Sequence, residues 1–236
     1  GGSISDSSIL QGIVLDKEIV HSGMPKKTTN SKIALINTAL EIEKTEVDAK
    51  INISTPDQMK AFLDEENKMI KTMVDKVVSS GATVVFCQKG IDDMSQHYLA
   101  KAGVLAVRRI KESDLTKLSK ASGARIVTNL DDLSEEDLGT ADLVEERKVE
   151  EDRWVFVEGC KHPKSVTLLL RAGSQRVVDE VERAVHDALM VVKDVMEVPS
   201  IVAGGGAPET FVATKIMGWS KSLTGREQLA AEKFAE

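Results

Sequence analysis

The sequence predicts an α/β protein followed by a mainly helical segment, and three observations support this fold class. Short apolar runs alternate with helical patterns between residues 82 and 127, and each helix there ends at a glycine. One long helical pattern with an apolar stripe covers residues 57–80. Three more helical patterns follow, over 177–197, from about 208, and over 226–236. Alternation of strands and helices is typical of a parallel sheet covered by helices.

The first elements lead into the long helix. Residues 11–20 alternate between apolar and polar, which predicts a strand and its turn, and residues 32–36 form a short apolar run that predicts a buried strand. Residues 47–53 alternate again and predict a half-exposed strand. The triplet at 54–56, Ser-Thr-Pro, then supplies a helix start, and Gly81 ends the helix.

The alternating part and a predicted hairpin come next. We expect strands over 82–87, 104–107 and 125–127, and helices over 92–102 and 113–121. Residues 129–150 are acidic and are expected to form a loop, in which Leu143 and Val144 could make a short strand. The runs 154–158 and 165–170 predict a hairpin around residues 159–164. The last helix, 226–236, carries no stop signal, which suggests a piece of a longer protein.

Composition excludes several classes of function. The chain has 236 residues, 42% of them hydrophobic, and a net charge of −7 without a basic block, so we expect no nucleic-acid partner. No apolar run is long enough to cross a membrane. Cys87 and Cys160 do not form a disulfide framework, the four histidines are scattered without metal-ligand spacing, and we expect a cytoplasmic protein with no metal site.

Phe62 and Leu63 lie early in the long helix, among charged residues. On the structural interpretation they begin the stripe that faces the core. On the functional interpretation they form an exposed apolar tip, and Met59 supports it because methionine side chains adapt to varied apolar partners. The pattern alone favours neither interpretation.

Asp187 and the glycines at 204–206 are the candidates for nucleotide chemistry. Asp187 lies in the middle of the long apolar helix 177–197, where an aspartate is usually structural. Gly204, Gly205 and Gly206 precede a helix, so their backbone could approach an anion, although a flexible turn explains them as well. The glycines match neither common phosphate-binding motif.

Many segments in order give the chain a resemblance to the group II chaperonins, the family of the archaeal thermosome and the eukaryotic t-complex chaperonin. The resemblance covers essentially the whole chain, and the archaeal members are the most similar. The segments that carry it are Gly12–Lys17, His21–Pro25, Phe62–Glu66, Lys89–Asp93, His97–Leu99, Gly159–Lys161, Leu169–Gly173, Glu182–Leu189, Gly204–Glu209 and Gly225–Leu229.

The resemblance implies a domain organisation. Residues 1–10 would be a linker from the intermediate domain, and 11–171 an apical domain of the swivelling β/α/β type. The helix 57–80 would be its helical protrusion, which acts as a built-in lid of the folding chamber. Residues 172–200 would be an intermediate-domain helix, and 201–236 a part of the equatorial domain.

The resemblance also implies roles for the candidate residues. Met59, Phe62 and Leu63 would contact unfolded clients, and neighbouring subunits of a double ring would be further partners. Asp187 would be the catalytic aspartate that orients the water attacking ATP, and Gly204, Gly205 and Gly206 would line the nucleotide site.

The chain lacks the family's phosphate-binding Gly-Asp-Gly-Thr-Thr segment and the metal-binding aspartate within it. ATP and Mg²⁺, the cofactors of the intact family member, are therefore not expected to bind well to this segment alone. Two alternatives to a client-binding chaperone segment remain, a plain structural α/β domain and an ATPase that needs the missing equatorial part.

Overall fold

A computed structural model describes residues 2–42, 55–149, 151–161 and 165–236. The chain divides into two compact units, unit 1 (Gly1–Gly173) and unit 2 (Ser174–Glu236), each of which is described by itself. Unit 1 is the predicted α/β part and unit 2 is helical. The strand expected at 47–53 lies outside the described residues.

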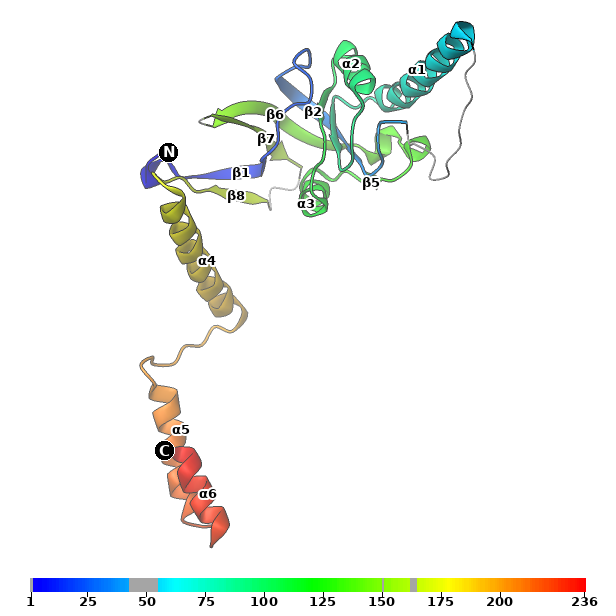
Figure 1. The fold of residues 1–236 in the computed structure, drawn as a ribbon. Coiled ribbons are helices and arrows are strands. Elements are labelled where there is room, and N and C mark those ends of the chain that lie inside the picture. Colours follow the sequence, from blue (N-terminus) through cyan, green and yellow to red (C-terminus); the bar gives the residue numbers. More distant parts are fainter. Residues whose placement is uncertain (1, 43–54, 150, 162–164) are drawn as a thin grey trace. The chain divides into compact units, whose positions relative to one another are not determined.

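Unit 1 is built around an eight-stranded mixed sheet, in the order β4-β3-β2-β6-β7-β1-β8, with β5 paired to β2 (Figure 1). In the described part of unit 1, three helices and three short 3-10 turns accompany the sheet. The strands are β1 (Ser8–Leu15), β2 (Lys27–Ile36), β3 (Val84–Cys87), β4 (Leu105–Val107), β5 (Ile126–Val127), β6 (Gly139–Val149), β7 (Asp152–Cys160) and β8 (Val166–Leu169). The helices are α1 (Pro56–Ser79), α2 (Asp93–Lys101) and α3 (Glu112–Ser122), and the 3-10 turns are η1 (Ile4–Asp6), η2 (Leu130–Asp132) and η3 (Glu135–Asp137).

The parallel part of the sheet is the part predicted from alternation. β2 pairs in parallel with β3 on one side and with β5 on the other, and β3 pairs in parallel with β4. The chain steps from β2 through α1 to β3 and through α2 to β4, then returns through α3 to β5 beyond β2. Because such crossovers are right-handed, α1 and α2 cover one face and α3 the other (Figure 1).

Two predictions for the antiparallel part are wrong. The acidic stretch 129–150, expected to be a loop with at most a short strand at Leu143 and Val144, contains around these two residues the eleven-residue strand β6, paired with β2 and β7. The expected hairpin between 154–158 and 165–170 does not form, because β1 lies between β7 and β8 and pairs with both. Both segments are strands, but β7 makes its hairpin with β6.

The core lies where helices cover the parallel strands. Every residue of β3 is fully buried, as expected for a strand with helices over both faces. The glycines predicted to end the three helices, Gly81, Gly103 and Gly123, all have positive φ, the left-handed conformation that glycine adopts without strain.

Helix α1 joins this core only through its second half. Thr55 caps its start by accepting a hydrogen bond from the backbone N–H of Gln58, 3.4 Å away. Its buried residues are Ile70, Val74 and Val77, and none occurs earlier in the helix. The first half of α1 therefore extends past the packed part of unit 1.

Unit 2 consists of α4 (Gln175–Glu197), α5 (Ala207–Ser220) and α6 (Arg226–Ala235). Helices α5 and α6 pack against each other. Helix α4 begins after Ser174, as predicted, and its strongly apolar face contains no buried residue. Within the described ranges, no helix combines the length and the apolar character that a membrane crossing requires.

Candidate functional site

The three apolar residues of the α1 tip are exposed. Met59, Phe62 and Leu63 retain 47%, 37% and 48% of their accessible surface. They precede the first buried residue of the helix, Ile70. The structure thus places them outside the core, although their spacing continues the core stripe. An exposed group of large apolar side chains on a monomer often marks a contact surface.

Helical spacing divides the tip into two faces. Phe62 is seven residues before Met69 and eleven before Met73, so these three residues share one face, which we call the Phe62 stripe. Leu63 is seven residues before the buried Ile70 and eleven before the buried Val74, so it extends the core-facing stripe. The two neighbouring tip residues therefore face different surroundings.

Asp187 lies on α4 and is ion-paired within its own helix. Its Oδ2 accepts a hydrogen bond from Nη1 of Arg183 at 2.7 Å, and Arg183 also binds Glu180 through Nε and Nη2 at 3.1 and 2.6 Å. The side chain of Asp187 is 60% exposed. A carboxylate fixed in this way on a helix can accept a further hydrogen bond from water.

Gly204, Gly205 and Gly206 lie directly before α5. Gly206 is its N-cap, with φ +79°, and Gly205 has φ +70°. A Cβ added at Gly204 or Gly205 would meet no atom within 4 Å, so nothing packs closely against these two glycines. Glu209 already places a negative charge in the first turn of α5.

The candidate residues supply few of the groups that usually hold ATP. A triphosphate is normally held by several backbone donors, a lysine and a metal ion. The glycines and the start of α5 offer backbone N–H groups alone, and Asp187 is engaged by Arg183. No group of three or more His, Cys, Asp or Glu side chains suited to a metal ion occurs among the described residues.

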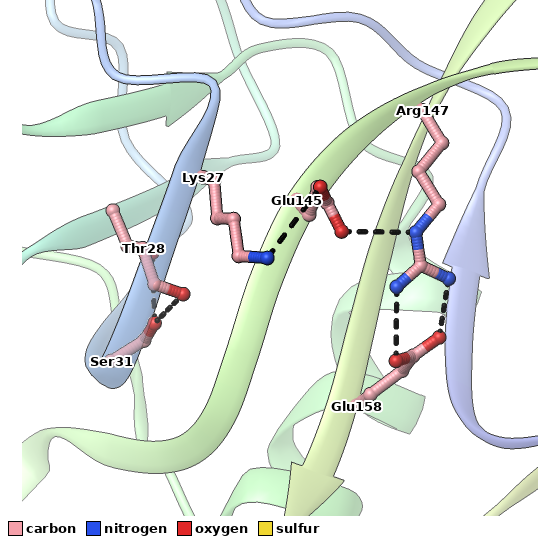
Figure 2. Close-up of polar contacts among 6 residues, drawn as sticks. All are labelled: Lys27, Thr28, Ser31, Glu145, Arg147 and Glu158. Carbon is pink, nitrogen blue, oxygen red and sulfur yellow. Dashed lines mark hydrogen bonds and ion pairs between the residues drawn. The ribbon is translucent and has the colours of Figure 1, made fainter.

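A polar network on the antiparallel sheet was not foreseen from the sequence (Figure 2). Arg147 on β6 donates through Nη1 and Nη2 to the two carboxylate oxygens of Glu158 on β7, at 2.7 and 3.1 Å. Its Nε donates to Glu145 at 3.0 Å, and Lys27 lies 3.9 Å from the same carboxylate. The guanidinium also lies 4.7 Å from the ring centroid of Phe156. The hydrogen bonding that Arg147 donates to Glu158 is the main cause that raises the pKa of Arg147 above its usual value.

The two cysteines lie in unlike surroundings. Cys87 ends β3 and is buried, with its Sγ 3.2 Å from the carbonyl oxygen of Thr38. Burial raises the pKa of the Cys87 thiol to about 11. Cys160 is partly buried, and its burial also raises the thiol pKa. Neither thiol has the lowered pKa of a nucleophilic cysteine.

Comparison with known proteins gives a consistent result. The model of the TCP-1/cpn60 chaperonin family matches residues 1–236. The chain is 58% identical to thermosome subunit alpha of Archaeoglobus fulgidus over 235 residues, and 59% identical to the thermosome subunit of Pyrococcus horikoshii over 236. Each alignment covers all of this chain and 43% of the relative, so the chain spans less than half the length of these relatives.

The fold has a counterpart among solved structures. The open-state monomer of a group II chaperonin from Methanococcoides burtonii superposes with a TM-score of 0.76 at 45% sequence identity. The superposition covers 100% of this chain and 52% of that chain.

Proposed function

The chain belongs to the TCP-1/cpn60 chaperonin family, and we propose that it is a chaperone segment that binds unfolded polypeptides through the tip of α1. The observation that carries this proposal is the exposure of Met59, Phe62 and Leu63 on a helix anchored at its other end. Unfolded chains expose apolar side chains in many sequences. A surface that binds them needs apolar area without a fixed shape, which methionine helps to supply.

We propose that the domains correspond to those of a group II chaperonin. Residues 11–171 would form an apical domain, with α1 as its helical protrusion and part of a built-in lid, and 1–10 the linker that leads into it. Residues 172–200 would contribute an intermediate-domain helix, and 201–236 the start of an equatorial segment. Similarity to thermosome subunits along the whole chain supports this organisation.

The nucleotide chemistry would belong to the complete protein. There, Asp187 would orient the water that attacks ATP, Gly204, Gly205 and Gly206 would line the nucleotide, and Mg²⁺ would come with it. Neighbouring subunits of a double ring would be the protein partners, and the cytoplasm the compartment. In the segment alone, the sparse donors around the glycines support weak or negligible ATP binding.

The test replaces Phe62 and Leu63 together by aspartate. This double variant should lose the ability to suppress aggregation of a denatured client, because two charges replace the apolar contact surface. The matched control replaces Ala61 and Asn67 by aspartate, which adds the same charge to the same helix without removing a large apolar side chain.

Far-UV circular dichroism should show that both double variants are folded. Unchanged suppression by the Phe62/Leu63 variant would favour the alternative, a structural domain without client affinity. Equal loss in both variants would point to charge rather than apolar contact and would also argue against the proposal.

A further inference from the structure

The cavity where the strand order reverses is the feature that the proposed function leaves unexplained. β3 and β4 lie on one side of β2 and β5 on the other, so the chain changes direction between β2 and β5. In open α/β sheets, ligands bind at this point, beyond the carboxyl ends of the strands. We call the cavity found there the switch-point cavity.

Segments from three parts of unit 1 line the switch-point cavity. Residues between Thr38 and Ile42, just after β2, form one wall, residues between Thr128 and Leu130, just after β5, a second, and one side of α1 the third. Its volume is about 580 Å³, within the range of small-ligand sites. The lining residues are Thr38, Ala39, Glu41, Ile42, Glu65, Lys68, Met69, Thr72, Met73, Lys76, Thr128, Asn129 and Leu130.

The chemistry of the lining disfavours an anionic ligand. Lys76 is ion-paired with Asp131, and Lys68 lies 3.7 Å from Glu65. Glu41 adds a negative charge to the wall. Both signs of charge therefore surround the cavity, without the excess of positive charge that a phosphate group needs.

Apolar and neutral polar groups make up the rest of the wall. Met69 and Met73 contribute flexible apolar surface, and Leu130 is a buried apolar residue beneath the loop. Thr128 and Asn129 carry groups able to hydrogen-bond with peptide N–H and C=O. An apolar side chain attached to a peptide backbone suits this combination.

The Phe62 stripe leads from the tip of α1 into the cavity. Phe62, Met69 and Met73 share one helix face, and the last two line the cavity wall. Leu63 belongs to the other face of the helix, the one that carries the buried residues Ile70 and Val74 farther along. A chain that contacts Phe62 can therefore continue along α1 toward the loops after β2 and β5.

We propose that the switch-point cavity receives an apolar side chain of an extended unfolded polypeptide that also lies along the Phe62 stripe. This inference rests on the proposed function, because it supplies a second anchor for the same clients. The cavity fixes one client residue, while the exposed tip tolerates many sequences. A client with a large aliphatic residue a short distance from its tip-binding residues should bind best.

The test measures binding of a short synthetic peptide with one leucine among polar residues, and of the same peptide with aspartate in place of leucine. Methyl-labelled methionine NMR reports the site directly, since the chain has eight methionines. The leucine peptide should shift the methyl signals of Met69 and Met73 and leave that of Met94, on α2, unchanged. The aspartate peptide should shift neither.

Variants on α1 supply the second measurement. Met69→Glu should weaken binding of the leucine peptide by about tenfold or more, because it places a charge against the apolar side chain. Met69 is 52% exposed, so the variant should fold. Val78→Glu is the matched control, since Val78 is 37% exposed on the same helix and does not line the cavity.

The outcomes separate the two proposals. Shifts at Met69 and Met73, with selective weakening by Met69→Glu, support the cavity. Shifts at Met59 alone, or equal binding of the peptide by the Met69 and Val78 variants, would contradict the proposed cavity site. Neither result would contradict client binding at the tip of α1. If no methionine signal shifts and the chain does not suppress client aggregation, both the cavity site and client binding at the tip are contradicted.

Discussion

Arg147 and Glu158 are joined by two parallel hydrogen bonds, at 2.7 and 3.1 Å, across the β6–β7 ladder. Their strands are adjacent, but the two residues are not directly opposite, since Arg147 faces Trp154 and Glu158 faces Leu143. The pair is therefore offset by four residues along the ladder, on one sheet face, and the ring of Phe156 lies beside the guanidinium. This contact favours the register in which Arg147 lies opposite Trp154.

Replacing Arg147 by lysine should lower the free energy of unfolding by about 1–2 kcal/mol, since an ammonium cannot make the forked contact with Glu158. Urea denaturation at neutral pH measures the change. The control Arg176→Lys alters an exposed arginine of α4 and should leave unit 1 unaffected. A double-mutant cycle with Glu158→Gln should show coupling, and additive effects would mean that the pair contributes nothing of its own.

Asp137 should make unit 1 sensitive to acid. Hydrogen bonds from Arg125 and then Ser134 lower the pKa of Asp137 from 3.8 to about 2. A lowered folded-state pKa contributes stability that is present above the unfolded value and is lost as pH falls toward the folded value. Asp137→Asn should therefore be less stable than the parent chain at pH 7, with the difference shrinking between about pH 4 and pH 2.

Urea midpoints measured across that pH range test the assignment to Asp137. Asp132→Asn is the comparison, because Asp132 lies in the same acidic stretch and accepts the hydrogen bond from Arg125 through its backbone carbonyl oxygen, which the substitution keeps. A stability difference for Asp137→Asn that stays constant from pH 7 to pH 2 would contradict the explanation.

Cys87 should resist alkylation in the folded chain. Its thiol is buried and has a pKa of about 11, so little thiolate exists at pH 8. In the variant Cys160→Ser, where Cys87 is the remaining cysteine, mass spectrometry should show modification by iodoacetamide only after denaturant is added. Rapid modification of the native variant would show that β3 opens more readily than its burial indicates.

Asp187→Ala should not change phosphate release by this chain in the presence of ATP and Mg²⁺, because Asp187 is ion-paired with Arg183 and we expect the segment alone to bind a triphosphate weakly. A phosphate-release assay on both proteins measures this. Release by the parent chain that the variant abolishes would show that the segment is an ATPase by itself.

The parallel part of the fold could be predicted because its signals are local. Capping residues and glycines at 81, 103 and 123 mark the helix ends, and apolar runs mark buried strands. Strand β6 escaped prediction because its outer face carries Glu145 and Arg147, whose partner Glu158 comes from another strand. The predicted hairpin between β7 and β8 was wrong because β8 pairs with β1 instead. These two strands lie near opposite ends of unit 1 in the sequence, so no local pattern reveals their pairing.

The candidate site was predictable only as a set of residue types. The same spacing connects Leu63 to the core residues Ile70 and Val74, so the pattern could not reveal that the core ends before the tip. The switch-point cavity requires the loops after β2 and β5 to be neighbours, which follows from strand order rather than from any motif. For Asp187 and the glycines, the helical pattern predicts the helices on which or before which they lie. It does not predict whether these residues line a common pocket.

Among the described residues, helix α1 has buried side chains only from Ile70 onward, and this has a consequence for its amide protons. Short helices without packing partners are marginal in water, so the first turns of α1 should open and close without the rest of unit 1 unfolding. Amide hydrogen exchange should accordingly be fast near Met59 and slow near Val77 within one continuous helix. Met59 and its neighbours would then sample several backbone conformations while the sheet of unit 1 keeps one.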